Sequence, residues 1–140
     1  MLLWLKKNVL YIAWAQALVA TLGSLYFSEI LHWTPCVLCW WQRIMIYPLV
    51  FIIAVGILRK TQDIEYFVLP FAFTGFVITV YHNLLQYGII SEALAPCVAN
   101  IPCITNYYVG FSFITIPFLT LVAFAVIIAC MFIHNRTKNT

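Results

Sequence analysis

Hydrophobic residues along the chain are gathered into four long stretches that short polar segments separate. The stretches cover residues 9–27, 40–58, 66–87 and 110–133. Each is close to the length of about 20 apolar residues that an α-helix needs to cross the hydrocarbon layer of a membrane. The pattern therefore predicts an all-α membrane protein, in which a single domain of residues 1–140 forms a four-transmembrane-helix bundle.

The composition supports this interpretation. Hydrophobic residues make up 65% of the chain and charged residues 8%, whereas soluble domains contain roughly 45–50% and about 25%. Lys6 and Lys7 precede the first stretch, as basic residues precede the core of a signal peptide, but the apolar run is longer than the ~7–15 residues of such a core. We therefore expect a retained first helix. No nucleotide-binding loop or basic nucleic-acid patch is present, so no nucleic-acid partner is expected.

The basic residues predict how the helices are oriented. Six of the seven lie beside the same ends of the predicted helices: Lys6, Lys7, Arg59, Lys60, Arg136 and Lys138. Lys and Arg are enriched in the cytoplasmic segments of membrane proteins with short loops. Both termini are therefore expected in the cytoplasm, and residues 28–35 and 88–109 are expected to form two outer loops, the first leading into one cysteine pair at the outer end of the second helix and the second carrying the other pair.

The cysteines are sorted in the same way as the charges. Cys36, Cys39, Cys97 and Cys103 fall on the expected outer side, where disulfides persist, and Cys130 falls near the inner end of the fourth helix. Two bridges are expected, and four cysteines allow three connectivities. The simplest interpretation is that these bridges only staple the structure. Cys130 is interpreted as a small packing residue in an apolar helix.

The sequence TPCVLC around the first pair has the features of a reactive thiol site. Thr34 is suited to the N-cap of a helix and Pro35 to its first turn, which places Cys36 at the helix N-terminus. The helix dipole and the free N–H groups there favour a thiolate. A C-x-x-C sequence at a helix start is the arrangement of disulfide oxidoreductases. The C-x5-C spacing of Cys97 and Cys103 is a weaker signal by itself.

Two polar residues accompany the first cysteine pair. Arg43 lies on the same helical face as Cys36 and Cys39, because the three positions are spaced by three and four residues. It is expected just inside the hydrocarbon, where a charge is costly enough to indicate function, although a snorkelling anchor is the alternative. His82 is expected at a similar depth on the third helix, with a hydrogen-bonded packing residue as its alternative. Together these residues would frame a pocket for a lipophilic oxidant with carbonyl oxygens, such as a membrane quinone, which the arginine would hydrogen bond.

The string PCVLCWWQR, followed by a cysteine pair in the second outer loop of a four-helix protein, resembles the DsbB/BdbC family of thiol:quinone oxidoreductases. The resemblance implies an enzyme of the bacterial cytoplasmic membrane that reoxidises an extracytoplasmic thioredoxin-like thiol oxidase of the DsbA or BdbD type. A Cys97–Cys103 disulfide would accept electrons and pass them to Cys36–Cys39 and then to menaquinone or ubiquinone. By the same resemblance, Cys39 contacts the quinone and Arg43 supports it, whereas His82 matches only by helix and depth.

The loop pair departs from one branch of this family. Cys97 and Cys103 are six positions apart, as in the compact BdbC type, whereas the enterobacterial type separates the pair widely. Two other functions fit part of the pattern. Four outer cysteines are able to form a zinc-binding module, which leaves Arg43 unexplained, while the enzyme needs no metal. A non-catalytic helical scaffold subunit is the second alternative, and it predicts no quinone reduction by the isolated chain.

Overall fold

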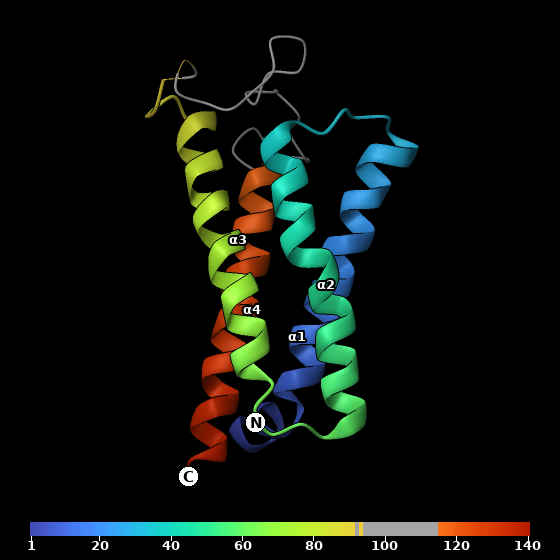
Figure 1. Cartoon of the computed structure of the whole chain (residues 1–140), viewed down its shortest axis with the longest axis vertical. Coiled ribbons are helices and arrows are strands. Elements are labelled where there is room, and N and C mark those ends of the chain that lie inside the picture. Colours follow the sequence, from blue (N-terminus) through green and yellow to red (C-terminus); the bar gives the residue numbers. More distant parts are fainter. Residues whose placement is uncertain (92, 94–114) are drawn as a thin grey trace.

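The computed structural model describes residues 1–91, 93 and 115–140. The regular elements of this part of the chain are helices: α1 (Leu2–Leu25), a short π-helix η1 (Tyr26–Ile30), α2 (Val37–Arg59), α3 (Glu65–Gln86) and α4 (Ile116–Lys138). The α-helices are all long and apolar enough to cross a membrane. The predicted all-α fold with four transmembrane helices is therefore confirmed (Figure 1).

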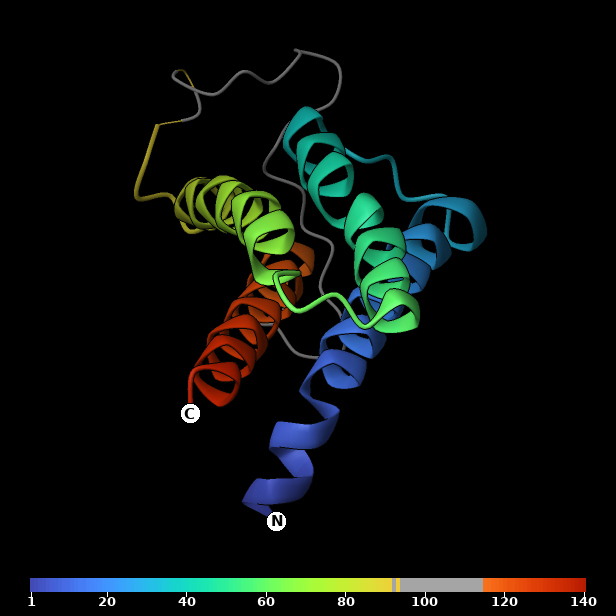
Figure 2. The same cartoon turned by 60° about the horizontal axis from the view of Figure 1, so that its bottom comes forward.

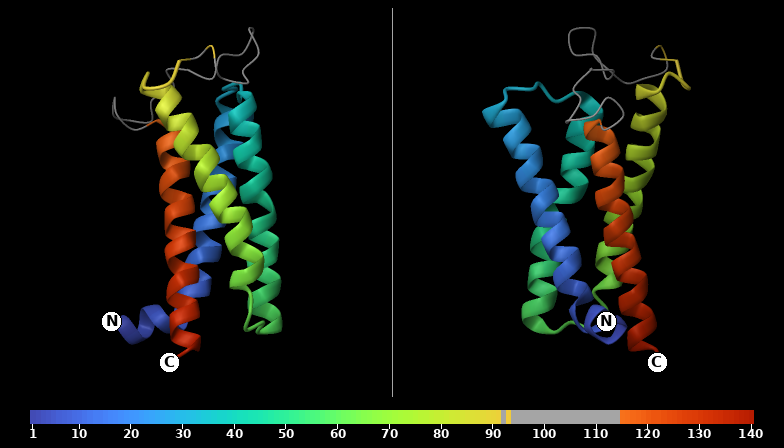
Figure 3. Two further views of the ribbon diagram at one scale, coloured as in Figure 1. Left: turned by 60° about the vertical axis from the view of Figure 1, so that its left-hand side comes forward. Right: turned by 180° about the vertical axis from the view of Figure 1, so that it is seen from behind.

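The four α-helices pack as a ring in which each contacts its two neighbours. Helix α1 packs against α2 and α4, and α3 packs against the same two helices from the other side. Figure 2 shows this arrangement obliquely, from the end of the bundle that carries the termini. Both termini lie at one end of the bundle, and the first turn of α2 and the end of α3 lie at the other (Figures 1 and 3). The residues of the first cysteine pair are thus at the end opposite the termini.

All four helices contribute to one apolar core. Its buried members include Ala13 and Ala17 of α1, Leu49 and Ile53 of α2, Val68 and Ala72 of α3, and Phe124 and Ile127 of α4. Gly75 of α3 lies directly against the ring of Phe124, and a Cβ at this position would overlap that ring. In lipid, burial of apolar side chains between helices provides little hydrophobic free energy, because the lipid tails are themselves apolar. Close van der Waals packing around small residues therefore contributes much of the helix association.

The first helix is longer than the apolar stretch that predicts it. It begins at Leu2 rather than at residue 9, and Figure 3 shows its first turns pointing away from the bundle. Trp4 in this part is 63% exposed. Trp side chains and basic residues such as Lys6 are favoured at the membrane–water interface. A count of apolar residues finds the part of a helix within the hydrocarbon and misses its continuation along the interface.

The other helices also differ from their predicted bounds at the ends. Helix α2 begins at Val37 rather than at residue 40. Helix α4 begins at Ile116, where the Thr115 hydroxyl accepts a hydrogen bond from the Phe118 N–H (3.4 Å), whereas the apolar stretch starts at residue 110. Residues 110–114 lie outside the described part of the chain. Helix α4 continues to Lys138, because basic residues in a last turn interact favourably with the helix dipole.

Candidate active site

The first turn of α2 is organised by Cys36. The prediction that Thr34 caps this helix is wrong: Cys36 is itself the N-cap, with extended backbone angles (φ −79°, ψ 176°). Its sulfur accepts a hydrogen bond from the Cys39 N–H (3.4 Å). Thr is favoured at the N-cap and Pro in the first turn of a helix. A prediction based on these preferences therefore puts the N-cap at residue 34, two positions before the observed one. The consequence drawn from it still holds, because Cys36 lies at the positive end of the helix dipole.

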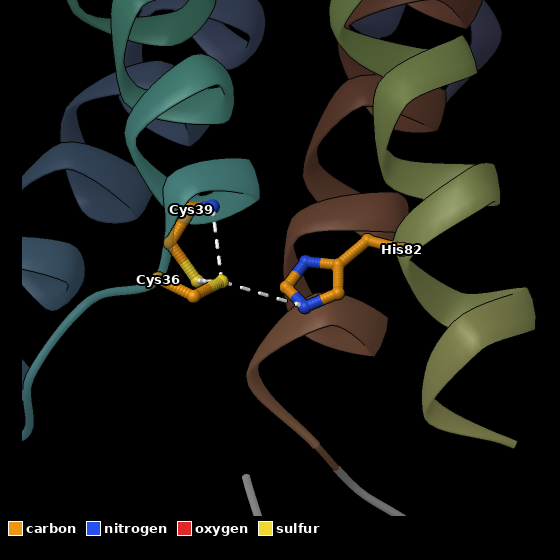
Figure 4. A group of neighbouring side chains, drawn as sticks. All are labelled: Cys36, Cys39 and His82. Carbon is orange, nitrogen blue, oxygen red and sulfur yellow. Dashed lines mark hydrogen bonds between the residues drawn. The ribbon is translucent and has the colours of Figure 1, made fainter. Parts of the chain in front are cut away.

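Cys36 and Cys39 are free thiols in this structure, with their sulfurs 3.2 Å apart. Cys36 is only 3% exposed, and its sulfur lies 3.8 Å from Nε2 of His82 on α3. Figure 4 shows the two thiols and the imidazole pointing toward one another. The hydrogen bond with Cys39, together with the neighbouring imidazole, lowers the pKa of Cys36 below that of an ordinary thiol. The cluster therefore favours Cys36 as a thiolate when the pair is reduced.

The other nitrogen of His82 contacts Gln42 of α2. Gln42 Nε2 lies 3.0 Å from His82 Nδ1, and both residues are buried. Gln42 belongs to the PCVLCWWQR motif but was not among the predicted site residues. The feature that could have marked Gln42 is its position as a polar amide within an apolar helix. A buried amide needs hydrogen-bond partners, so a polar group on a neighbouring helix was to be expected. The contact fixes the ring of His82 from the side opposite Cys36.

Arg43 is anchored to protein at the end of α1. Its guanidinium donates a hydrogen bond to the Ser24 carbonyl (3.1 Å) and lies over the Trp40 ring, 5.1 Å from its centroid. Ser24 is in the last turn of α1, directly before η1, near the negative end of the helix dipole. Tyr47, one turn further along α2, also reaches Ser24, with 3.5 Å between the two hydroxyl oxygens. These contacts show how an arginine is accommodated at this depth.

A cavity of about 290 Å³ opens beside these groups. Its polar lining includes Cys39, Gln42, Arg43 and His82, and its apolar lining comes mainly from α1 and α4, through Val19, Ala20, Leu119, Val122 and Ala123. Phe27 and Trp33 also line it, and their rings are stacked with centroids 5.2 Å apart. Neither aromatic residue was among the predicted site residues. A mostly apolar pocket with a few convergent polar groups is the usual form of a small-molecule site.

The structure brings four of the six predicted site residues together: Cys39, Arg43 and His82 line the cavity, and Cys36 contacts Cys39 and His82. Cys97 and Cys103 lie outside the described residues. Cys130 is 6% exposed and belongs to the apolar core, as a packing residue would. A dithiol at the head of a membrane helix, next to an imidazole and a cavity, defines a membrane protein of thiol–disulfide chemistry.

Comparison with known proteins identifies the family. The chain belongs to the DsbB family, described as "Disulfide bond formation protein DsbB", whose profile matches residues 6–134. Disulfide bond formation protein C of Bacillus subtilis (strain 168) is 47% identical over 130 residues, which cover 93% of this chain and 94% of the relative. Probable disulfide formation protein C 1 of Bacillus anthracis is 42% identical over 133 residues, covering 95% and 96% of the two chains. The predicted membership of the DsbB/BdbC family is thus confirmed.

More distant relatives agree with these two. Probable disulfide formation protein C of Halalkalibacterium halodurans is 40% identical over 132 residues, covering 94% of this chain and 96% of the relative. No solved structure matches the chain. At the level of the family, the chain is therefore a multi-pass membrane protein of disulfide bond formation, with the oxidoreductase activity that this name describes.

Proposed function

We propose that the protein is a disulfide-generating thiol:quinone oxidoreductase of the bacterial cytoplasmic membrane. It reoxidises an extracytoplasmic thioredoxin-like thiol oxidase and passes the electrons through the cysteine pair at 97 and 103, then through Cys36 and Cys39, to a membrane quinone. The observation that carries the proposal is the cavity that joins the Cys39 thiol to Arg43 and His82. The relatives that are named for disulfide formation support the same reaction class.

The residues around the cavity fit the head group of a quinone. A volume of about 290 Å³ is near the lower limit of the usual range for ligand pockets, which suits a flat ring system. The walls are mainly apolar, and Arg43 supplies N–H donors of the kind that a quinone oxygen accepts. Val19 and Val122 line the cavity and are 65% and 43% exposed. A mouth at these residues would face lipid, where the apolar tail of a quinone is soluble.

Each residue of the site has a role in this reaction. A bound quinone supplies an acceptor for two electrons and two protons. Formation of the Cys36–Cys39 disulfide releases two electrons and two protons, so the exchange is balanced. Arg43 places a fixed positive charge beside the face that carries Cys39 and stabilises negative charge there. The imidazole of His82, 3.8 Å from the Cys36 sulfur, is in position to hold a proton that the thiol releases.

The two cysteines of the motif divide the work. Cys39 lines the cavity and is proposed to react on the quinone side, whereas Cys36 caps the helix at the end of the bundle and is proposed to exchange with the loop pair. Thiol–disulfide exchange requires attack by a thiolate on a sulfur that it can reach. The loop cysteines 97 and 103 would receive the electrons of the partner oxidase first.

The proposed sidedness follows from the basic residues. The two ends of the chain and the link between α2 and α3 lie at one end of the bundle (Figure 1). The residues near these segments include Lys6, Arg59 and Lys138, and such residues are retained on the cytoplasmic side. Cys36 at the opposite end would then face the extracytoplasmic side, where a secreted oxidase is available.

The test is an anaerobic reaction of the purified protein with a soluble quinone and a reduced thioredoxin-like partner, followed by quinone absorbance. We expect quinone reduction that requires Cys36 and Cys39. Cys97→Ser is expected to abolish oxidation of the partner, while a small dithiol still reduces the first pair and quinone still reoxidises it. The matched control is Cys130→Ser, for which turnover should stay within about twofold because this residue only packs in the core.

The alternatives make different predictions in the same assay. A scaffold subunit would reduce no quinone under any of these conditions. If quinone does not reoxidise Cys36 and Cys39 in the Cys97→Ser protein, the proposed order of electron transfer is contradicted.

A further inference from the structure

The cluster of Cys36, Cys39 and His82 has the composition of a metal site. Each residue offers one ligand atom, and the three atoms lie within 4.8 Å of one another. We propose that the protein with a reduced Cys36–Cys39 pair binds one Zn²⁺ or Cd²⁺ ion through these three residues, and that the disulfide form does not bind it. The ion would block the dithiol from reaction and act as an inhibitor that recognises only the reduced state.

The positions of the ligand atoms are close to those that zinc requires. With Zn–S distances of about 2.3 Å and Zn–N distances of about 2.0–2.1 Å in a tetrahedron, two sulfurs are about 3.7 Å apart and a sulfur and a nitrogen about 3.5 Å apart. The two sulfurs of the cluster are 3.2 Å apart, and the Cys36 sulfur is 3.8 Å from His82 Nε2. All three ligand atoms lie within 4.8 Å of one another, so side-chain shifts of about one ångström would bring them to tetrahedral positions.

The imidazole is held in the orientation of a ligand. Figure 4 shows His82 pointing toward both sulfurs from α3, while the cysteines come from α2. Its other nitrogen, Nδ1, is 3.0 Å from Gln42 Nε2. Histidines that bind metals almost always have such a partner on the second nitrogen, which fixes the ring. Rotation of the Gln42 amide exchanges its donor for its acceptor, so Gln42 is able to support the tautomer in which Nε2 binds the ion.

The charges of the ligands and the ion favour metal binding at this buried site. Two thiolates and one divalent cation form a neutral complex, and a neutral group is far less costly to bury than an isolated charge. Cys36 and His82 are 3% and 1% exposed. Oxidation to the disulfide removes both thiolates, which are the ligands that soft and borderline metals prefer. The affinity is therefore expected to depend on the redox state of the pair.

The fourth position of the ion would face the cavity. Cys39 and His82 both line this space, and a zinc site with three protein ligands usually completes its shell with water. Because the thiolates are the groups that must attack or be oxidised, coordination would stop electron transfer through the pair. This site differs from a four-cysteine zinc module: it uses His82 and neither loop cysteine.

The test measures metal binding without quinone or partner. The full chain with Cys97→Ser and Cys103→Ser, which leaves only the first pair and Cys130 as thiols, is reduced, freed of reductant and titrated with Zn²⁺ against a chromophoric chelator. We expect one ion per chain and no binding above background after oxidation of the pair. His82→Gln should weaken binding at least about tenfold. His32→Asn is the matched control with unchanged affinity, since His32 is exposed and its positive φ of 55° suits Asn.

The outcomes are separate from those of the proposed function, because no turnover is measured. Equal affinity of the parent and a folded His82→Gln protein would overturn the site, since the cysteines alone would then account for binding. Equal binding by the reduced and oxidised parent would overturn the redox dependence. If His82→Gln does not fold, X-ray absorption of the zinc-loaded parent decides: two sulfur ligands and one imidazole are expected, and a shell without imidazole would reject the proposal.

Discussion

Gln42 and His82 are 40 positions apart in the sequence and face each other between α2 and α3, with 3.0 Å between Gln42 Nε2 and His82 Nδ1. Both side chains are buried, with 4% and 1% of their surface exposed. The contact leaves Nε2 of His82 directed at the Cys36 sulfur (Figure 4). Gln42 forms no hydrogen bond with either thiol in the described part of the chain, and it nevertheless orients the imidazole that faces Cys36.

The first prediction concerns this orienting contact. Gln42→Met keeps the approximate shape of the side chain and removes the buried hydrogen bond between residue 42 and His82 Nδ1, at a cost of up to about 1.5 kcal/mol. Loss of this bond is expected to destabilise the transition state, in which the imidazole must face Cys36. The maximal rate of quinone reduction should therefore drop by up to roughly tenfold, because 1.36 kcal/mol corresponds to a factor of ten. Steady-state kinetics with a soluble quinone measure the drop.

The control for this variant is Thr74→Val. Thr74 is on the same helix as His82 but is exposed and bonds only to the Pro70 carbonyl, so its loss should leave the rate unchanged. A purely structural role of Gln42 would not alter the protonation pattern of the ring. ¹⁵N-imidazole spectra of His82 should show that the proton changes its distribution between the two nitrogens in Gln42→Met. An unchanged spectrum with a normal rate would contradict the positioning role.

The second prediction concerns Arg43. A charge-assisted hydrogen bond contributes roughly 1.5–3 kcal/mol, so Arg43→Ala should weaken the use of quinone by about 10- to 100-fold at equal protein level. Arg43→Lys keeps the charge and loses the planar fork of the guanidinium, and should recover only part of the loss. The apparent quinone affinity should change, while exchange between the loop disulfide and the partner should stay close to normal.

The structure supplies a control for Arg43. The guanidinium also bonds the Ser24 carbonyl, so Arg43→Ala loses a contact between α1 and α2 as well as a group in the cavity. Tyr47→Phe removes only the other contact to Ser24, between the two hydroxyl groups, and should leave quinone affinity unchanged. Slowed partner exchange with an unchanged quinone dependence in Arg43→Ala would place this residue outside the quinone site.

Much of the fold was predictable because it depends on local sequence. Four apolar runs of the right length define four membrane helices, and the Thr34-Pro35-Cys36 sequence marks the start of α2 to within two residues. The boundaries were harder to predict because they depend on individual interactions. Cys36 takes the N-cap through its own sulfur, which is not among the side chains that usually cap helices.

The site was predictable only in its parts. The spacing of Cys36, Cys39 and Arg43 places them on one helical face, whereas the approach of His82 to Cys36 depends on how α3 packs against α2. The sequence predicts that Arg43 and His82 lie at a similar depth, but it does not indicate which face of α3 packs against α2. For the same reason the sequence did not assign a role to Gln42, whose function exists only through its contact with His82.

The third prediction concerns a buried carboxylate at the other end of the bundle. Glu65 at the start of α3 is 1% exposed, 3.4 Å from His134 Nδ1 and 3.6 Å from Lys138 Nζ, both on α4. His134→Leu should destabilise the protein by about 1–3 kcal/mol, because it leaves the carboxylate without one of its partners. Adding Glu65→Leu should restore much of the loss, since an apolar pair often replaces a buried polar one without cost.

Thermal unfolding in detergent measures both variants of this pair. His32→Asn is the matched control, because that histidine is exposed at the opposite end of the bundle and should not change the unfolding temperature. A double variant less stable than His134→Leu alone would show that Glu65 is stabilised by other groups. Quinone reduction should be normal in every folded variant, since the cluster is remote from the cavity.

The last prediction tests the orientation of the bundle. Cys36 is too buried to report on accessibility, so single cysteines are placed at exposed positions in a chain whose native cysteines are replaced by Ser. Glu29→Cys lies at the end that carries Cys36, and Gln62→Cys lies in the link between α2 and α3. Because basic residues are retained in the cytoplasm, a membrane-impermeant maleimide should label residue 29 in intact cells and residue 62 only after lysis. The reverse pattern would place the Cys36 end in the cytosol, out of reach of a secreted oxidase, and would reject the proposed partner.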